Sequence, residues 1–273
     1  MKKGQVTMFV ILGIVLVAVI LSVIFLRKDI ASGIERVKIS QSTVLQNRVA
    51  ETTPFVEDCV KSVAEDGVLK IMARGGYNEP KKAVQYDYYT IPVYFDKGKE
   101  SVQTIAGIEK ELALYVQNNV PVCANVGTLG FPVKSLSKPA ADVSIGSKAV
   151  SVAVDWQLQV GGEQESATIR DFSADVKAGL TSPYEYAIEL YNKQKAIKVL
   201  SLIDLARLAK QKDFILHFDM QDDAMVYLLT FNRTLINKQP LVYTFAIRQE
   251  PPKKGGSGSL LAGASPAPSD APA

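Results

Sequence analysis

The sequence predicts an α+β fold, in which a single N-terminal transmembrane helix precedes an ectodomain of several helices and antiparallel β-hairpins or a meander. Three observations predict this class. The run from Met8 to Leu26 contains no charged residue. Between Phe55 and Ala64, apolar residues recur at the spacing of an amphipathic helix. From Val150 to Gln157, apolar and polar residues alternate, which is typical of a strand with one buried face.

The composition is that of a folded domain that binds no nucleic acid. With 47% apolar and 22% charged residues, the chain can bury a substantial core. The net charge of +3 is small and the lysines are dispersed, so no nucleic-acid partner is expected. One histidine and two cysteines leave few metal ligands or general bases. We therefore expect no cofactor and no metal.

The apolar run is long enough to cross a bilayer. At about 1.5 Å per residue, a helix over residues 8–26 is about 28 Å long, close to the thickness of the hydrocarbon core. Lys2 and Lys3 precede it, and this charge bias predicts a single-pass cell-membrane protein with a cytoplasmic N-terminus and an extracytoplasmic body. The residues expected to contact lipid are Met8, Phe9, Leu12, Leu16, Leu21, Phe25 and Leu26.

This organisation divides the chain into five segments. Residues 1–7 are a cytoplasmic head with a signal motif, and residues 8–26 are the transmembrane helix. Residues 27–50 continue as a membrane-proximal helix, and residues 51–250 form the extracytoplasmic α+β domain. The tail, residues 251–273, consists mainly of Pro, Gly, Ser and Ala, which bury too little apolar surface to fold.

The motif Lys3-Gly4-Gln5 directly precedes the apolar run. It resembles the class III signal peptide of archaeal type IV pilin-like proteins. The resemblance implies cleavage between Gly4 and Gln5 by a membrane peptidase that leaves the apolar helix attached. It also implies contacts with like subunits, or with other proteins of a pilus machinery, through residues 8–50. Phe9 departs from the family pattern, because many pilins carry at this position a glutamate linked to subunit assembly.

Two other fates of the head stay open. A conventional signal peptidase needs small residues directly after a shorter apolar region, and the nearest such site is Ala31-Ser32-Gly33. That site lies beyond the charged residues 27–29. The remaining alternative is an uncleaved membrane anchor.

Local signals place the elements of the ectodomain. Thr53-Pro54 predicts a helix start and Arg74-Gly75-Gly76 its end. Pro92 is expected on an edge strand or a broken strand. Further helices are expected over residues 30–50 and 104–118 and from Ser182-Pro183 towards Lys198, and strands over residues 84–95, 150–157, 167–176, 214–220, 225–231 and 241–248.

Cys59 and Cys123 can form a disulfide if the body faces an oxidising exterior. Closing a loop of about 65 residues would contribute on the order of 4 kcal/mol. The alternative is a pair of separate buried thiols. Asn232-Arg233-Thr234 is an N-glycosylation sequon, so Asn232 is a candidate modification site.

Catalytic signals are weak. His217 lies two positions before Asp219 on a predicted strand, but no nucleophile-elbow motif accompanies them. The adjacent acids Asp222 and Asp223 fit ordinary turn chemistry. We therefore expect a structural or adhesive surface protein, pilin-like and not an enzyme. The alternatives are an uncleaved anchor that presents a ligand- or partner-binding ectodomain and, third, a cell-surface hydrolase.

Overall fold

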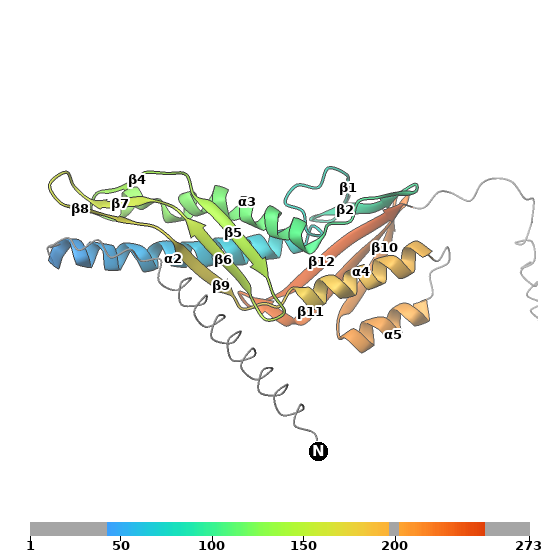
Figure 1. Ribbon diagram of the computed structural model, residues 1–273. Coiled ribbons are helices and arrows are strands. Elements are labelled where there is room, and N and C mark those ends of the chain that lie inside the picture. The colour runs from blue at the N-terminus through green and yellow to red at the C-terminus, as the bar shows by residue number, and fades with distance from the viewer. Residues whose placement is uncertain (1–42, 197–201, 249–273) are drawn as a thin grey trace, which may run out of the picture.

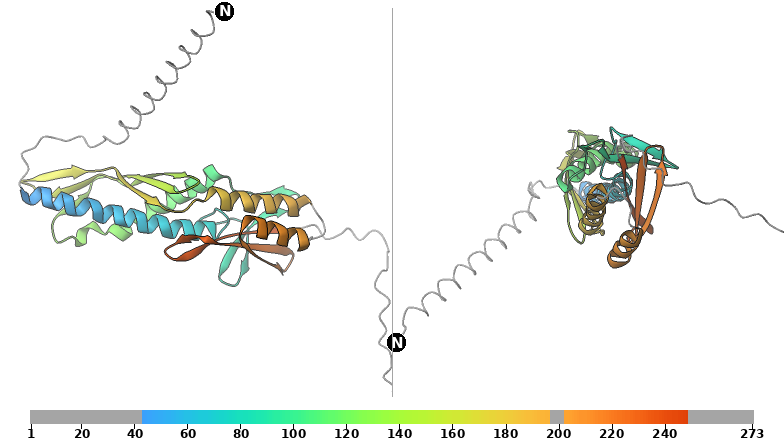
Figure 2. Two further views of the ribbon diagram at one scale, coloured as in Figure 1. Left: turned by 90° about the horizontal axis from the view of Figure 1, so that it is seen from below. Right: turned by 90° about the vertical axis from the view of Figure 1, so that its right-hand side faces the viewer.

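The computed structural model describes residues 43–196 and 202–248. They form an elongated molecule with the long helix α2 as its spine (Figure 1), and Figure 2 shows it from two further sides. The helices are α2 (Thr43–Met72), α3 (Ile105–Ala124), the 3-10 turn η1 (Val126–Thr128), α4 (Thr181–Ala196) and α5 (Leu202–Lys212).

The strands form two groups. The first, here called the meander, consists of β4 (Val133–Ser135), β5 (Ala140–Ile145), β6 (Val150–Asp155), β7 (Leu158–Gly161), β8 (Ser166–Ile169) and β9 (Phe172–Val176). The second, here called the mixed sheet, consists of β1 (Ala83–Tyr86), β2 (Tyr89–Asp96), β3 (Lys99–Glu100), β10 (Ile215–Gln221), β11 (Ala224–Ile236) and β12 (Gln239–Arg248).

Helix α2 corrects the prediction of a new helix at Thr53-Pro54. It runs without interruption from Thr43 to Met72, with Pro54 in its interior. The hydroxyls of Thr52 and Thr53 donate to the carbonyls of Arg48 and Val49 one turn earlier, at 2.7 and 3.0 Å. The predicted boundary between residues 50 and 51 therefore falls inside a helix.

The predicted start of α3 and the predicted end of α2 agree with the structure, but α3 continues beyond the predicted residue 118 to Ala124. Thr104 caps α3, because its hydroxyl accepts a hydrogen bond from the Gly107 amide at 3.1 Å. Gly75 and Gly76 follow α2 with positive φ, and the Gly76 amide donates to the carbonyl of Ile71 at 2.8 Å, which closes the helix. Helix α4 begins at Thr181, one residue before the predicted Ser182-Pro183 start.

Helices α2 and α3 pack antiparallel at close range. Gly67 makes this possible, since a Cβ there would lie 2.7 Å from side-chain atoms of both Leu112 and Tyr115. The contact joins a core that draws on α2, α3, α4, α5 and both groups of strands. This arrangement fixes the relative position of the two helix faces that flank the disulfide described below.

The six strands of the meander form two three-stranded antiparallel sheets, β5-β6-β9 and β4-β7-β8. The two sheets follow one another along a single bent ribbon (Figure 1). Strand β6 shows the predicted alternation, with its valines buried and its other residues exposed. It pairs with β5 and β9, while β7 pairs with β4 and β8. The bend falls at Trp156, whose indole N–H donates to the Ser135 hydroxyl at 2.8 Å. The predicted hairpin around Gly161-Gly162 is confirmed as the β7–β8 pair, with Val160 opposite Ala167.

The mixed sheet corrects the predicted fold class. The order is β1-β2-β12-β11-β10. The predicted antiparallel pairing of β10 with β11 and of β11 with β12 is confirmed. However, β12 pairs with β2 in parallel, from Ala246 opposite Val93 to Arg248 opposite Asp96. Pro92 therefore lies in a strand with neighbours on both sides, just before the parallel pairing begins. The protein is α+β with a mixed sheet, not a purely antiparallel one.

The transmembrane part of the predicted class has no counterpart among the described helices. Within residues 43–196 and 202–248, no helix has the length and apolar character needed to cross a membrane. The predicted span, residues 8–26, lies outside the described residues, as do the head 1–7 and the tail 251–273.

The mixed sheet curls so that its two outer strands meet. Tyr86 on β1 and His217 on β10 form a 2.8 Å hydrogen bond between the hydroxyl and Nε2. A second, smaller core lies on the inner side of the curl and consists of Val84, Ile91, Val93, Ala224, Val226, Leu228 and Ala246. The opposite face of the sheet contributes to the main core.

Tyrosines dominate that opposite face. Tyr94 and Tyr243 are fully buried, and their hydroxyls lie 2.6 Å apart. The Tyr94 hydroxyl also lies 2.6 Å from the carbonyl of Gly75, to which it donates. The rings of Tyr94 and Phe245 stack at 5.4 Å between centroids. Burial raises the pKa of Tyr94, Tyr191, Tyr227 and Tyr243 well above the ordinary tyrosine value.

We expect the fold to lose stability at alkaline pH because of these tyrosines. A phenol whose pKa is raised on folding stabilises the fold fully below about pH 10, the pKa of an unfolded tyrosine, and less as the pH rises beyond it. Urea unfolding between about pH 8 and pH 12 should show a falling free energy only above about pH 10.

A matched pair of variants tests this cause. Tyr243→Phe removes one of the four buried phenols and should reduce the alkaline loss, whereas Tyr88→Phe should leave it unchanged because Tyr88 is fully exposed. Equal pH profiles for the two variants would show that the buried phenols are not responsible.

Candidate functional site

Most of the predicted N-terminal site residues lie outside the described structure. This holds for the cleavage pair Gly4 and Gln5. It holds equally for the predicted lipid contacts, which are Met8, Phe9, Leu12, Leu16, Leu21, Phe25 and Leu26.

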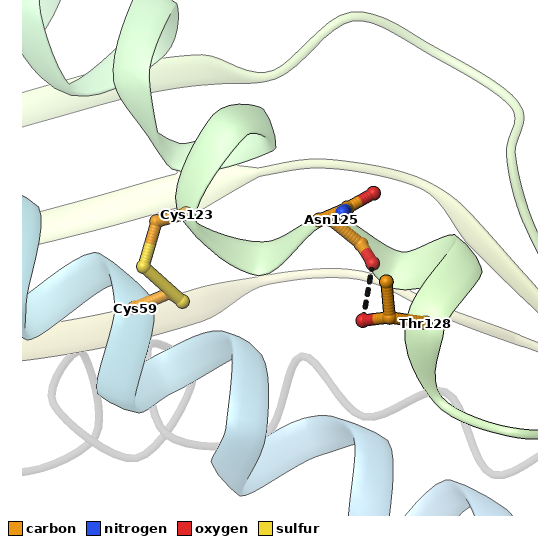
Figure 3. The surroundings of a disulfide bond; sticks show 4 residues. All are labelled: Cys59, Cys123, Asn125 and Thr128. Atoms are coloured by element: carbon orange, nitrogen blue, oxygen red, sulfur yellow. Dashed lines mark hydrogen bonds between the residues drawn. A yellow bond between two sulfur atoms is a disulfide. The ribbon is translucent and has the colours of Figure 1, made fainter.

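The predicted disulfide between Cys59 and Cys123 is confirmed. It joins the middle of α2 to the last turn of α3, with 5.7 Å between the Cα atoms (Figure 3). Cys59 is buried, but Cys123 is exposed. Asn125 ends α3 by donating its amide to the carbonyl of Pro121 at 3.1 Å, and its own carbonyl accepts from the Thr128 hydroxyl at 2.9 Å. The bond therefore holds the end of α3 against α2.

A surface groove opens beside this disulfide, and we call it the α2–α3 groove. Its volume is about 810 Å³, within the range of about 300–1,000 Å³ that is usual for ligand pockets. Two helices form its walls, and the turn between β11 and β12 forms one end. It is lined by Ser62, Val63, Asp66, Leu69, Lys70, Arg74, Tyr115, Asn119, Val122, Cys123, Asn237 and Gln239.

Three of the lining residues, Ser62, Asp66 and Lys70, are spaced four apart on α2 and so share one face of that helix. Arg74 follows at the same spacing in the turn after the helix. Close helix packing at Gly67 brings Tyr115 of α3 against this face. The Tyr115 hydroxyl donates to the Asp66 carboxylate, and the Lys70 ammonium lies 4.8 Å from the centre of the Tyr115 ring. The groove thus combines polar and apolar side chains and is ordered by contacts between its own walls.

Burial raises the pKa of Tyr115 to about 12, and the hydrogen bond to Asp66 adds to the shift. The Tyr115 phenol is therefore neutral at physiological pH and acts as a donor to Asp66. Arg74 donates through Nη1 to the carbonyl of Asn78 at 2.6 Å. The remaining donors of its guanidinium are free of any ion pair within the described residues.

His217 and Asp219 are both exposed on β10, on the face of a sheet. The His217 ring binds the Tyr86 hydroxyl, and the amide of Met220 donates to the Asp219 carboxylate at 2.8 Å. Desolvation raises the pKa of Tyr86, and the negative charge of Asp219 raises it further. His217 thus links β10 to β1, whereas the Asp219 carboxylate binds the backbone of the next residue on its own strand.

The other candidate residues are also placed. Asn232 is exposed on β11, next to the irregularity in its pairing with β12, so its side chain is accessible. Asp222 and Asp223 form the β10–β11 turn, and Asp223 binds Arg248 at 2.7 Å. Across residues 43–196 and 202–248, no three His, Cys, Asp or Glu side chains gather as metal ligands would.

The α2–α3 groove was not predicted from the sequence. One signal was present, the spacing of four between Asp66, Lys70 and Arg74 at the C-terminal end of a predicted helix. It could not reveal a groove, because the opposite wall comes from α3 and from a turn more than 160 residues further along the chain.

No model of a known protein family matches this chain, and no curated protein matches it. The class of the site is therefore defined by its own residues. It is a surface groove of mixed polar and apolar lining that carries two cations and lies beside a disulfide bond.

Proposed function

We propose that this chain is an extracytoplasmic structural or adhesive protein, a subunit or minor component of a pilin-like surface assembly. The Cys59–Cys123 disulfide carries the proposal, because such bonds persist in oxidising compartments and are rare in reducing ones. The resemblance of Lys3-Gly4-Gln5 to a class III signal adds the pilin-like part. The exposed position of His217 and its bond to Tyr86 favour a non-enzymatic role.

The location can be tested by thiol labelling in intact cells with a membrane-impermeant maleimide. A Ser144→Cys variant places a reporter thiol on an exposed position of β5. We expect it to be labelled before lysis, while Cys59 and Cys123 react only after reduction. Labelling of Cys59 and Cys123 without reductant, and only after lysis, would contradict an extracytoplasmic location.

The pilin-like part has its own test, the N-terminal sequence of the protein recovered from native cells. A chain that begins at Gln5 and co-purifies with filaments would support a subunit or minor component. A chain that begins at Met1 would contradict pilin-type processing.

A second candidate function is a surface domain that presents a ligand-binding site. The α2–α3 groove favours it, because its volume and its mixed hydrogen-bonding lining suit a small ligand. The N-terminal result distinguishes the two candidates, since only the first requires loss of residues 1–4.

A further inference from the structure

We propose that the α2–α3 groove binds carboxylate-bearing sugars, so that the chain adheres to acidic glycans. This inference rests on the adhesive role proposed above and adds the class of ligand. It is carried by two cations without carboxylate partners in a groove whose remaining lining consists mainly of hydrogen-bonding side chains.

Lys70 and Arg74 are the cations. Lys70 lies in the last turn of α2 and Arg74 four residues later, in the turn that follows the helix, and like charges at this spacing repel each other. None of the ion pairs formed among the described residues includes either of them. Both side chains are half-buried in the wall of the groove. An anion placed there would relieve their repulsion.

The guanidinium of Arg74 is suited to a carboxylate. Its planar fork can donate two parallel hydrogen bonds to the two carboxylate oxygens. One donor, Nη1, is used by the carbonyl of Asn78, which holds the group in place and leaves the others available. Lys70 supplies a second positive charge one helical turn away.

The rest of the lining is suited to sugar hydroxyls. The side-chain amides of Asn119, Asn237 and Gln239 come from three different places in the fold and line the same groove. Each amide can both donate and accept, as a hydroxyl does. Asp66 and Ser62 add an acceptor and a hydroxyl on the α2 wall.

A neutral sugar fits less well. Such ligands gain from an open aromatic face, and the one aromatic ring in the groove is that of Tyr115. Lys70 already lies over this ring, 4.8 Å from its centre. Binding must then depend on charge and hydrogen bonds, which favours a sugar that carries a carboxylate.

An acidic peptide also fits less well. Helical walls offer no free strand edge to which a peptide backbone could add. A bound helix would need a row of apolar anchors, but Val63 is buried and only Leu69 and Val122 remain accessible.

The experiment measures binding of a galacturonate trimer to the full-length chain in non-ionic detergent by calorimetry. The comparison ligand is the same trimer with its carboxyl groups reduced, and a hexaglutamate peptide represents acidic peptides. We expect the acidic trimer to bind at least about tenfold more tightly than the reduced one, as the loss of a charge-assisted contact predicts. Binding should weaken as salt rises.

The test variant is Lys70→Gln with Arg74→Gln, and its matched control is Lys61→Gln with Lys81→Gln, two exposed lysines outside the groove. The test variant should bind the acidic trimer at least about tenfold more weakly, and the control should bind as the parent does. Arg74→Lys keeps the charge but not the fork and should give an intermediate loss. If the double variant fails to fold, Arg74→Lys is the test variant in its place.

Three results would overturn the proposal. They are no binding of the acidic trimer, equal binding of the acidic and the reduced trimer, and equal binding by the test and control variants. Tighter binding of hexaglutamate, lost in the test variant, would assign the groove to acidic peptides instead. A chain that sits in a surface assembly but binds no trimer would refute this inference and leave the proposed function intact.

Discussion

Replacing Cys59 and Cys123 together by serine is expected to lower the free energy of unfolding by about 4 kcal/mol. The bond closes a loop between residues 64 apart. Without it, the unfolded chain gains the conformational freedom of that loop, while the folded state keeps its packed helices. Urea unfolding at neutral pH, compared between the parent and the double variant, measures the loss.

Two controls make this result specific. Reduction of the parent with a thiol reagent removes only the cross-link and should account for most of the loss. The rest of the loss in the double variant comes from the hydroxyl that Cys59→Ser places at a buried position. Val122→Ser, at a residue 76% exposed beside Cys123, should change the free energy of unfolding very little. A double variant as stable as the parent would show that loop closure contributes nothing here.

The same substitution links stability to the groove. The disulfide holds the end of α3 against α2, and Cys123 lines the α2–α3 groove together with Asn119 of the same helix. Loss of the disulfide should therefore loosen the α3 wall of the groove but not the α2 wall.

The sequence predicted helix ends well where the end depends on contacts between residues only a few positions apart. The Thr104 cap and the Gly75-Gly76 end of α2 are of this kind. The Thr53-Pro54 signal misled, because the same two residues fit a helix start or an exposed position inside a helix. Upstream of the proline, Leu45 is 2% exposed and the Thr52 hydroxyl bonds the Arg48 carbonyl, so the helix extends back beyond the predicted start.

Long-range pairing was beyond local signals. The alternation in β6 and β10 predicted strands, but alternation does not identify a neighbour. The parallel contact between β2 and β12 joins segments about 150 residues apart, with α3, the whole meander and α4 between them. Only the packing of these elements brings the two strands together, which explains the error in fold class.

The candidate site divides in the same way. The disulfide could be predicted, because only two cysteines are present and only their compartment was in question. The α2–α3 groove could not be predicted, because nothing in the sequence distinguishes Lys70 and Arg74 from other lysines and arginines. Their lack of carboxylate partners becomes visible only when the surrounding elements are in place.

Gly75→Ala is expected to lower the free energy of unfolding by about 3 kcal/mol. Gly75 has φ of +54°, so a side chain strains the backbone there. In addition, its Cβ would lie 2.4 Å from the carbonyl oxygen of Thr244 and 2.6 Å from the ring of Pro92. Neither group can move freely, because β12 and β2 are paired and buried. Any shift of Gly75 would also break the hydrogen bond from the buried Tyr94 hydroxyl to its carbonyl.

Gly98→Ala is the matched control, and it separates backbone strain from close packing. Gly98 has φ of +87°, but nothing lies within 4 Å of the added Cβ. It should therefore show only the cost of the left-handed conformation, about 1 kcal/mol. Both variants change the unfolded chain in the same way, so the difference between them in urea unfolding measures the close approach of the α2 end to β12. Equal losses would mean that the strands yield to the methyl group, and the end of α2 would then be a loose contact with the mixed sheet.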